Sequence, residues 1–293
     1  MSFAIFRRKN RSMISGPITL VVGNRLALKL EGLGPDKRHI VIKSSITAPL
    51  SIEQKGSDGQ REQLITLTAK QAWPLLSLEA YEKTSGARID QCKTPETLRC
   101  VTSVQITIVE PLQLPAENTD AGALARLLLA ESISPGKNYP GGADSLLAMQ
   151  WMRVVIENRM RFKDAQYLGD PAARTITAVI KASKGGEQFK SFSGYPVIGS
   201  VQSKIISDSL NFANDGTYGE FAAYRLHVQN AIAVATGVSV SADPTSSGLY
   251  AWRTADSGSP GNNFVFYKNF GGQGFYTLTS EFMANPKDPG RKR

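Results

Sequence analysis

The hydrophobic pattern of the chain changes once, between residues 111 and 120, and this change limits the folds available to it. Before Pro111, short runs of alternating apolar and polar residues are separated by glycine-containing turns, which is typical of strands. After Asp120, apolar residues recur every three or four positions, which is typical of helices that bury one face. We therefore expect an α+β chain in which a β-rich N-terminal part precedes a mainly α C-terminal part.

Residues 17–112 are expected to form a β-sandwich-like domain. Several short runs in this range are rich in β-branched residues, which favour strands. These runs are ITLVVG, LALKLEG, HIVIKSS, LSIEQKG, LITLTA and VTSVQITIVEP. One interruption, AKQAWPLLSLEAYEKTSG, favours a helix over part of residues 69–85. No catalytic arrangement of side chains is recognisable in this domain.

Residues 118–282 are expected to form the second domain. Asn118, Thr119 and Asp120 are N-cap candidates for a helix that runs to about Ser132. A second helix follows, with Asp144 or Ser145 as its cap. Further helices are predicted at 171–184, 199–213 and 218–236. The glycine- and aromatic-rich residues 246–278 predict loops and a short hairpin.

The net charge of +9 favours a polyanionic partner. Two basic clusters, Arg7-Arg8-Lys9 with Arg11 and Arg291-Lys292-Arg293, are expected in solvated tails at residues 1–16 and 283–293. No nucleic-acid-binding motif is recognisable, so we do not expect a nucleic-acid partner. No run approaches the roughly 18 consecutive apolar residues of a membrane span.

The two cysteines, Cys92 and Cys100, lie on either side of a short loop that contains Pro95. They either close a disulfide in an oxidising compartment or remain ordinary thiols. The chain has two histidines, and their spacing from the cysteines does not match a zinc site. We therefore expect neither a metal site nor a cofactor.

The stretch ALARLLLAES, residues 123–132, places the carboxylate of Glu131 on an apolar helix face. Leu124, Leu127 and Leu128 lie seven, four and three residues before Glu131, so all three share its face. Burial among leucines disfavours the charged form of a carboxyl group, which raises its pKa and suits it to general-acid catalysis. The alternative is that Glu131 lies at a frayed helix end and points to water.

Four short motifs in this order resemble the SleB-type family of spore-cortex-lytic cell-wall hydrolases. The motifs are the apolar helix ending in Glu131, Asn158-Arg159, Gln188-Phe189, and Asp243-Pro244-Thr245 followed by Gly248 and Tyr250. The resemblance covers about residues 119–280 and excludes the β-rich domain. It implies a lysozyme-like catalytic domain at 118–282 that acts on the glycan strands of peptidoglycan.

The reaction implied by the resemblance is that of a lytic transglycosylase. Glu131 alone would protonate the glycosidic oxygen between N-acetylmuramic acid and N-acetylglucosamine. It would then act as the base while the muramic 6-hydroxyl attacks C1 and leaves a 1,6-anhydro end. A muramidase that hydrolyses the same bond is the alternative, and two-carboxylate glycosidases need a second acid at a set distance. The available carboxylates are Asp144, Glu157, Glu187 and Asp243, and none has a strong claim.

The candidate substrate-binding residues are polar or aromatic. Ser132 follows the glutamate where the family usually has alanine, and it either hydrogen-bonds the carboxyl group or caps the helix. Gln188 either binds an N-acetyl group or is an ordinary loop amide. Tyr195, Tyr250 and Trp252 either stack on sugar faces or belong to the core.

The substrate lies outside the cytoplasm, whereas the N-terminus MSFAIFRRKNRSM does not resemble a secretory signal. We therefore expect a protein made in the cytoplasm that acts in the periplasm or cell wall of a target cell. Delivery would use a type VI secretion machine or a phage tail, with the β-rich domain as a wall-binding or docking module and an immunity protein as a partner. The alternative is a non-enzymatic wall-binding protein or a structural component of a phage or secretion system.

Overall fold

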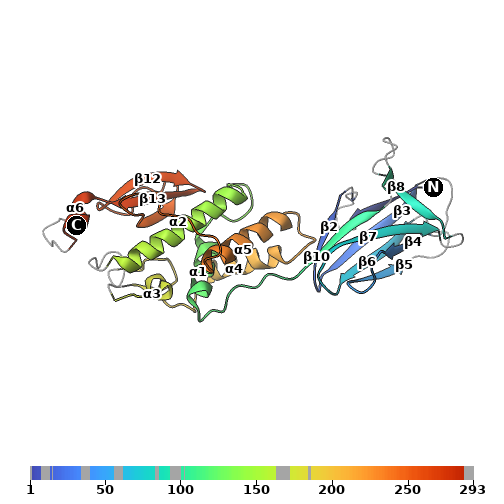
Figure 1. The fold of residues 1–293 in the computed structure, drawn as a ribbon, viewed down its shortest axis with the longest axis horizontal. Helices are drawn as coiled ribbons and strands as arrows, with labels where there is room; N and C mark the ends of the chain where they lie inside the picture. Colours follow the sequence, from blue (N-terminus) through green and yellow to red (C-terminus); the bar gives the residue numbers. More distant parts are fainter. Residues whose placement is uncertain are drawn as a thin grey trace. The chain divides into compact units, whose positions relative to one another are not determined.

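The computed structural model describes residues 2–7, 14, 16–33, 40–55, 62–82, 86–92, 100–101, 103–162, 172–183 and 186–286. The chain divides into two compact units. The first comprises Met1–Pro111 and Asn214–Gly219, and the second comprises Leu112–Ala213 and Glu220–Arg293. The first unit is built from strands, and the second contains all six helices of the described chain (Figure 1).

Ten strands of the first unit pair into one sheet. They are β1 (Ser2–Arg7), β2 (Ile18–Val21), β3 (Arg25–Leu33), β4 (Ile40–Ser44), β5 (Leu50–Lys55), β6 (Glu62–Ala69), β7 (Trp73–Glu82), β8 (Arg88–Cys92), β9 (Cys100–Val101) and β10 (Val104–Val109). Their order is β2-β10-β7-β8-β1-β3-β6-β5, with β4 paired to β7 and β9 to β8. Alternating residues such as Leu28, Leu67 and Ile106 point into one apolar core.

The helix predicted within residues 69–85 is wrong, because most of this range is β7. Leu76, Leu78 and Ala80 alternate inward and are almost fully buried. The strand pairs antiparallel with β10, β4 and β8. The residues of β7 have no strong preference for a strand, and its partner strands supply its hydrogen bonds.

The basic N-terminal tail predicted for residues 1–16 is wrong over Ser2–Arg7, which form β1. This strand pairs antiparallel with β3 over its whole length, and Ile5 is buried in the core. The remaining basic residues of the two clusters, at 8–9, 11 and 291–293, lie outside the described residues. Cys92 and Cys100 face each other in the register of β8 and β9, and residues 93–99 between them are also outside the described part.

The second unit contains six helices. They are α1 (Asp120–Glu131), α2 (Gly142–Arg161), α3 (Ile176–Lys181), α4 (Ser200–Ala213), α5 (Phe221–Ala235) and α6 (Ser280–Ala284). Thr119 is confirmed as the N-cap of α1, since its hydroxyl accepts a hydrogen bond from the backbone N–H of Gly122. Asp144 and Ser145 do not cap α2, because this helix already begins at Gly142.

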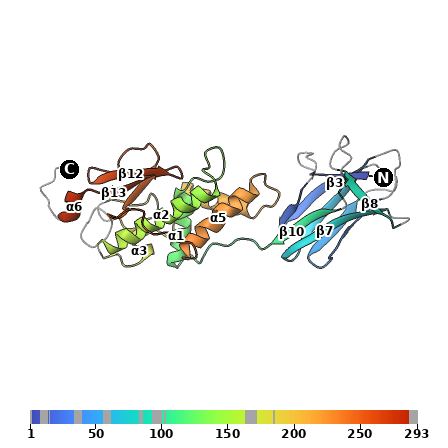
Figure 2. The ribbon, with the colours of Figure 1, turned by 45° about the horizontal axis from the view of Figure 1, so that its top comes forward.

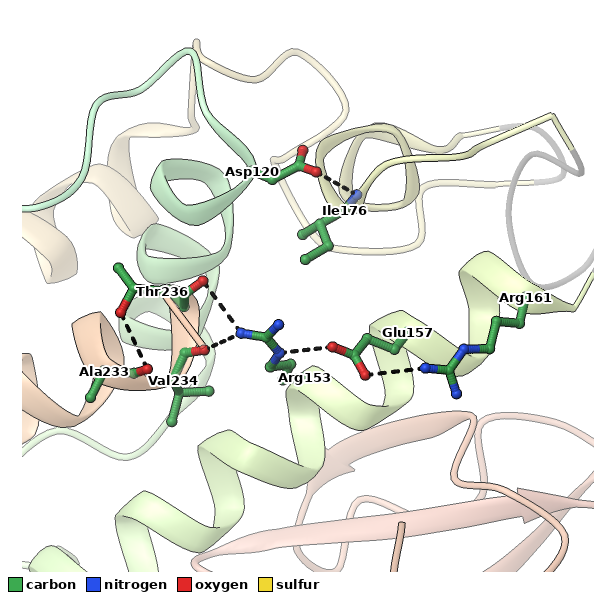
Figure 3. Close-up of polar contacts among 9 residues, drawn as sticks. Asp120, Arg153, Glu157, Arg161, Ile176, Ala233, Val234 and Thr236 are labelled. Atoms are coloured by element: carbon green, nitrogen blue, oxygen red, sulfur yellow. Dashed lines mark hydrogen bonds and ion pairs between the residues drawn. The ribbon is translucent and has the colours of Figure 1, made fainter. Parts of the chain in front are cut away.

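Side-chain contacts to backbone groups tie these helices together (Figure 3). The carboxylate of Asp120, in the first turn of α1, accepts a hydrogen bond from the backbone N–H of Ile176 at the start of α3. It also accepts one from the backbone N–H of Thr177. Arg153 of α2 donates to the carbonyl oxygen of Val234 on α5 and pairs with Glu157. α1 packs against α3, α4 and α5, which buries most of its surface.

A three-stranded antiparallel sheet follows the helices in the second unit. Its strands are β11 (Ala251–Thr254), β12 (Phe264–Phe270) and β13 (Gln273–Leu278), in the order β11-β13-β12. Trp151 of α2 contacts Phe270 and Phe275 of this sheet, which runs beside α2 in both views (Figures 1 and 2). The prediction of loops and a short hairpin for residues 246–278 is therefore incomplete, because the segment forms three paired strands.

The expectation of a mainly α, lysozyme-like domain is therefore wrong. The second unit is itself a mixture of helices and a sheet, and the sheet supplies buried aromatic side chains to its core. Tyr250, Trp252, Phe275 and Tyr276 of this segment are buried, whereas Phe266 and Tyr267 of β12 are exposed. Strand pairing also satisfies the backbone groups of the segment. Within the described residues, no helix is both long enough and apolar enough to span a membrane.

Candidate functional site

Glu131 is the last residue of α1, and its surroundings are apolar. Leu124, Leu127 and Leu128 are fully buried. The side chain of Glu131 is mostly buried, with part of its surface still open to solvent. Burial raises the pKa of the Glu131 carboxyl group above its usual value. Glu131 therefore does not lie at a frayed helix end.

Two side chains favour the charged form of Glu131 and limit this rise in pKa. Trp252 of β11 lowers the pKa of the carboxyl group as a hydrogen-bond donor, and the only donor of its side chain is the indole N–H. The ammonium group of Lys190, an exposed residue of the loop before α4, lowers the pKa through its positive charge. The backbone of Glu131 is also held, because Nε2 of Gln273 donates to its carbonyl oxygen at 2.8 Å. The sheet and the loop thus meet at the end of α1.

Ser132 caps the helix and does not bind the carboxyl group of its neighbour. Its hydroxyl donates to the carbonyl oxygen of Leu128 at 2.5 Å and lies 3.5 Å from Nε2 of His227. Nδ1 of His227 lies 3.2 Å from the hydroxyl of Ser145 at the start of α2. His227 of α5 is fully buried, and burial lowers its pKa to about 4, so it is neutral at pH 7. It is a satisfied core residue that links α1, α2 and α5.

Arg159 of α2 lies beneath the loop that precedes α4. Its Nε donates to the carbonyl oxygen of Tyr250 at 2.7 Å, and one terminal nitrogen donates to Oε1 of Gln188 at 3.1 Å. The guanidinium carbon lies 5.3 Å from the ring centre of Phe189. Phe189 stacks in turn on Trp252, with ring centres 5.1 Å apart and planes inclined by 27°. Burial lowers the pKa of Arg159 to about 10, which leaves the group charged at neutral pH.

The neighbouring Asn158 holds the segment that leads into β11. Its Nδ2 donates to Oδ2 of Asp243 at 2.6 Å and to the carbonyl oxygen of Leu249 at 3.0 Å. Asp243 also accepts from the backbone N–H groups of Thr245 and Leu249. The motif residues at 158–159, 188–189 and 243–250 therefore contact one another, and Trp252 connects them to Glu131.

The remaining predicted binding residues are less available than the sequence indicates. The amide of Gln188 is occupied on both sides, since it also donates to the carbonyl oxygen of Gly186. Tyr195 is 2% exposed, and its hydroxyl donates to the carbonyl oxygen of Glu117. Tyr250 is buried against Phe162. Of the predicted aromatic residues, Trp252 is the one that lowers the pKa of the Glu131 carboxyl group.

The four candidates for a second catalytic carboxylate have other partners or positions. Asp243 stabilises a turn, and Glu157 pairs with Arg153 and Arg161 on α2. The carboxylate of Glu187 accepts hydrogen bonds from Ser193. Asp144 is exposed in the first turn of α2. This distribution leaves Glu131 as the candidate acid. In the part of the chain that is described, no group of three or more histidine, cysteine or acidic residues is placed to hold a metal ion.

The sequence did not indicate the roles of Gln273 and Lys190. Gln273 belongs to a strand whose pairing with β11 brings it to Glu131 from 142 residues away. Lys190 is one of many basic residues, and its position follows from the fold of the loop around Phe189. The one available signal was that Lys190 follows Gln188-Phe189 directly.

Comparison with known proteins gives little further information. No protein-family profile and no curated protein matches the chain. Structures of the S-layer protein SbsC show weak similarity. Domains 4 and 5 are 13% identical with a TM-score of 0.23 over 32% of this chain and 48% of theirs, and domains 5–6 are 12% identical with a TM-score of 0.27 over 47% and 55%. The matches thus span about half of these structures, and they do not identify a lysozyme-like domain.

Proposed function

We propose that this protein cleaves the glycan strands of peptidoglycan, with Glu131 as the single general acid and base. The observation that carries the proposal is the environment of this carboxyl group. It lies at the end of a buried helix, its pKa is raised by burial, and part of it remains open to solvent. A carboxylic acid that stays protonated closer to neutral pH can donate its proton to a leaving oxygen.

The resemblance of the surrounding motifs to the SleB-type hydrolases supplies the substrate class. Residues 158–159, 188–189 and 243–250 carry that resemblance, and their side chains form one connected set of contacts that reaches Glu131 through Trp252. Such a convergence of residues that lie far apart in the sequence supports a common site. The net charge of +9 suits an anionic wall polymer.

In the proposed reaction the Glu131 carboxyl proton passes to the glycosidic oxygen between N-acetylmuramic acid and N-acetylglucosamine as the C1–O bond breaks. The carboxylate that remains takes the proton of the muramic 6-hydroxyl while O6 bonds to C1. This second step restores the protonated acid and leaves a 1,6-anhydro end. It consumes no water and uses no second carboxylate, which agrees with the distribution of the other acidic side chains.

Digestion of purified sacculi, followed by mass spectrometry of the soluble products, tests the proposal. We expect anhydromuramic ends from the wild-type protein and a rate at least about a hundredfold lower from Glu131→Gln. Glu157→Gln is the matched control, because it makes the same change on α2 and should retain activity. Reducing ends in place of anhydro ends would change the assignment to a muramidase. No products from the wild type, or full activity in Glu131→Gln, would overturn the proposal.

A further inference from the structure

A continuous stack of side chains connects the Glu131 carboxyl group to a cation on another helix. Trp252 lowers the pKa of the Glu131 carboxyl group as a hydrogen-bond donor, and its sheet is tied to Glu131 through Gln273. Phe189 stacks on Trp252 with ring centres 5.1 Å apart, and the guanidinium carbon of Arg159 lies 5.3 Å from the ring centre of Phe189. Phe189 and Trp252 are both buried. The three residues come from α2, the loop before α4 and β11, so the stack joins three elements at one point.

We propose that Arg159, Phe189 and Trp252 act as a positioning stack that fixes the orientation of the Glu131 carboxyl group for proton transfer. The inference rests on the proposed function and extends it to residues that do not themselves touch the substrate. Trp252 would hold the carboxyl group directly, and Phe189 would fix the plane of the indole ring. Arg159 would fix the ring of Phe189, together with Gln188 before Phe189 and the backbone of Tyr250 before Trp252.

The hydrogen bonds of Arg159 support this role. Its Nε binds the carbonyl oxygen of Tyr250, two residues before Trp252, and its terminal nitrogen binds the amide of Gln188, directly before Phe189. One guanidinium group thus holds the backbone beside the indole and the side chain beside the phenyl ring. A planar, forked donor can make both bonds at once while its face lies on an aromatic ring, which an ammonium group cannot do.

The energetic cost of placing this cation inside the protein also argues for a specific role. Burial of a guanidinium group is unfavourable unless a partner compensates its charge. Among the residues whose positions the structure gives, Arg159 is bound by uncharged oxygen acceptors and an aromatic face. An apolar side chain would fill a purely structural position without this cost. Orientation of the neighbouring groups accounts for the choice of arginine.

Several groups face Glu131 and bear on its titration. Trp252 approaches from β11, and Lys190 is the nearby cation from the loop. Gln273 of β13 binds the backbone carbonyl only. His227 of α5 contacts Ser132 and is neutral above a pH of about 4. Loss of the indole donor should therefore raise the pKa of Glu131, because the remaining hydrogen bonds do not reach its carboxyl group.

The test compares Trp252→Phe with Trp151→Phe. Both changes replace a buried indole by phenyl beside the same sheet, but Trp151 packs on Phe270 and Phe275 and does not contact Glu131. For Trp252→Phe we expect a roughly tenfold or greater fall in kcat with little change in KM, and a high-pH limb of the activity profile that moves to higher pH. Trp151→Phe should leave the limb in place.

Arg159→Lys provides a second variant, with Arg153→Lys as its control on the same helix. Arg153 also donates to a backbone carbonyl, that of Val234, but its contacts lead to α5. We expect a lower kcat for Arg159→Lys and an unchanged kcat for Arg153→Lys. The melting temperatures of the two variants should be equal. If either control changes kcat and the pH profile as much as its partner, or if Trp252→Phe and Arg159→Lys change neither, the positioning stack is overturned.

A readout that does not depend on activity separates the two proposals. The Glu131 side-chain carbon resonance can be followed by ¹³C NMR during a pH titration, with its assignment taken from the Glu131→Gln variant. We expect its midpoint to move upward in Trp252→Phe and to stay unchanged in Trp151→Phe. If the wild-type protein leaves sacculi intact, the proposed function fails, and this titration still decides whether Trp252 holds the carboxyl group.

Discussion

Groups close to the carboxyl group of Glu131 shift its pKa in opposite directions. Its burial disfavours the charged form, whereas Trp252 and Lys190 favour it. Burial is the largest of these effects, so the pKa is raised, as the three leucines before Glu131 predicted. The sequence could indicate the leucines because they lie on the same helix face. It named Trp252 as a candidate for sugar stacking but could not indicate its effect on Glu131, because Trp252 lies 121 residues later in a strand that pairing with β13 brings close.

His227 is expected to make the stability of the protein depend on pH. An unfolded chain holds the histidine with a pKa near 6.5, whereas burial lowers it to about 4 in the folded protein. The unfolded state therefore binds more protons between these two values, so the free energy of unfolding falls as pH drops from 6.5 towards 4. The full loss corresponds to about 3 kcal/mol, and above pH 6.5 this group has no effect.

Urea unfolding at several pH values measures this dependence. The difference between wild type and His227→Gln should change with pH mainly between 6.5 and 4, because the variant lacks the titrating ring. Equal pH dependence in the wild type and His227→Gln would show that His227 is not held neutral by burial.

The helices and the strands differ in how far their sequences predicted them. α1 could be predicted almost to the residue, because Thr119 caps it locally and its apolar residues follow one face. β7 and the sheet β11-β13-β12 could not, since their hydrogen bonds come from strands elsewhere in the chain. The glycines in 246–278 suggested loops, whereas Gly271 and Gly272 make the turn between two paired strands.

Gly272 is expected to be essential for this turn. It has a φ of +78°, and a Cβ at this position would lie 2.0 Å from Cδ1 of Ile133, two residues after Glu131. Gly258 has the same φ of +78°, but a Cβ there would meet no atom within 4 Å. Gly258→Ala should therefore cost only the backbone strain of about 1 kcal/mol, and Gly272→Ala should cost clearly more, up to about 3 kcal/mol.

Thermal unfolding followed by circular dichroism compares the two glycine variants directly. The proposed function adds a second expectation, since displacement of Ile133 at the end of α1 would move Glu131 and lower activity in Gly272→Ala alone. Equal loss of stability in both variants would mean that Ile133 yields without cost. In that case the turn would not fix the sheet against the end of α1.

At the scale of the whole molecule, the candidate site combines motifs that lie far apart in the sequence. The sequence could therefore predict which residues belong to the site, but not how they are arranged. Asn158-Arg159, Gln188-Phe189 and the segment from Asp243 are short patterns with little meaning alone. Their order suggested a common family, but the contacts among them depend on α2, a long loop and a sheet packed together. Each residue was accordingly named from a motif, and its role follows from the fold.

If the protein acts on peptidoglycan as proposed, its net charge of +9 predicts how its binding to the wall should depend on salt. If the charge attracts the protein to an anionic polymer, binding must weaken as salt screens it, because the screening length falls from about 10 Å at 0.1 M to about 3 Å at 1 M.

The Glu131→Gln variant, which we expect to be inactive, allows this measurement without digestion of the wall. Co-sedimentation with sacculi should fall several-fold between 0.05 and 0.5 M sodium chloride. Chitin, an uncharged polymer of N-acetylglucosamine, is the matched control and should show no such fall. Binding to sacculi that does not respond to salt would mean that recognition of the glycan, and not the overall charge, brings the protein to its substrate.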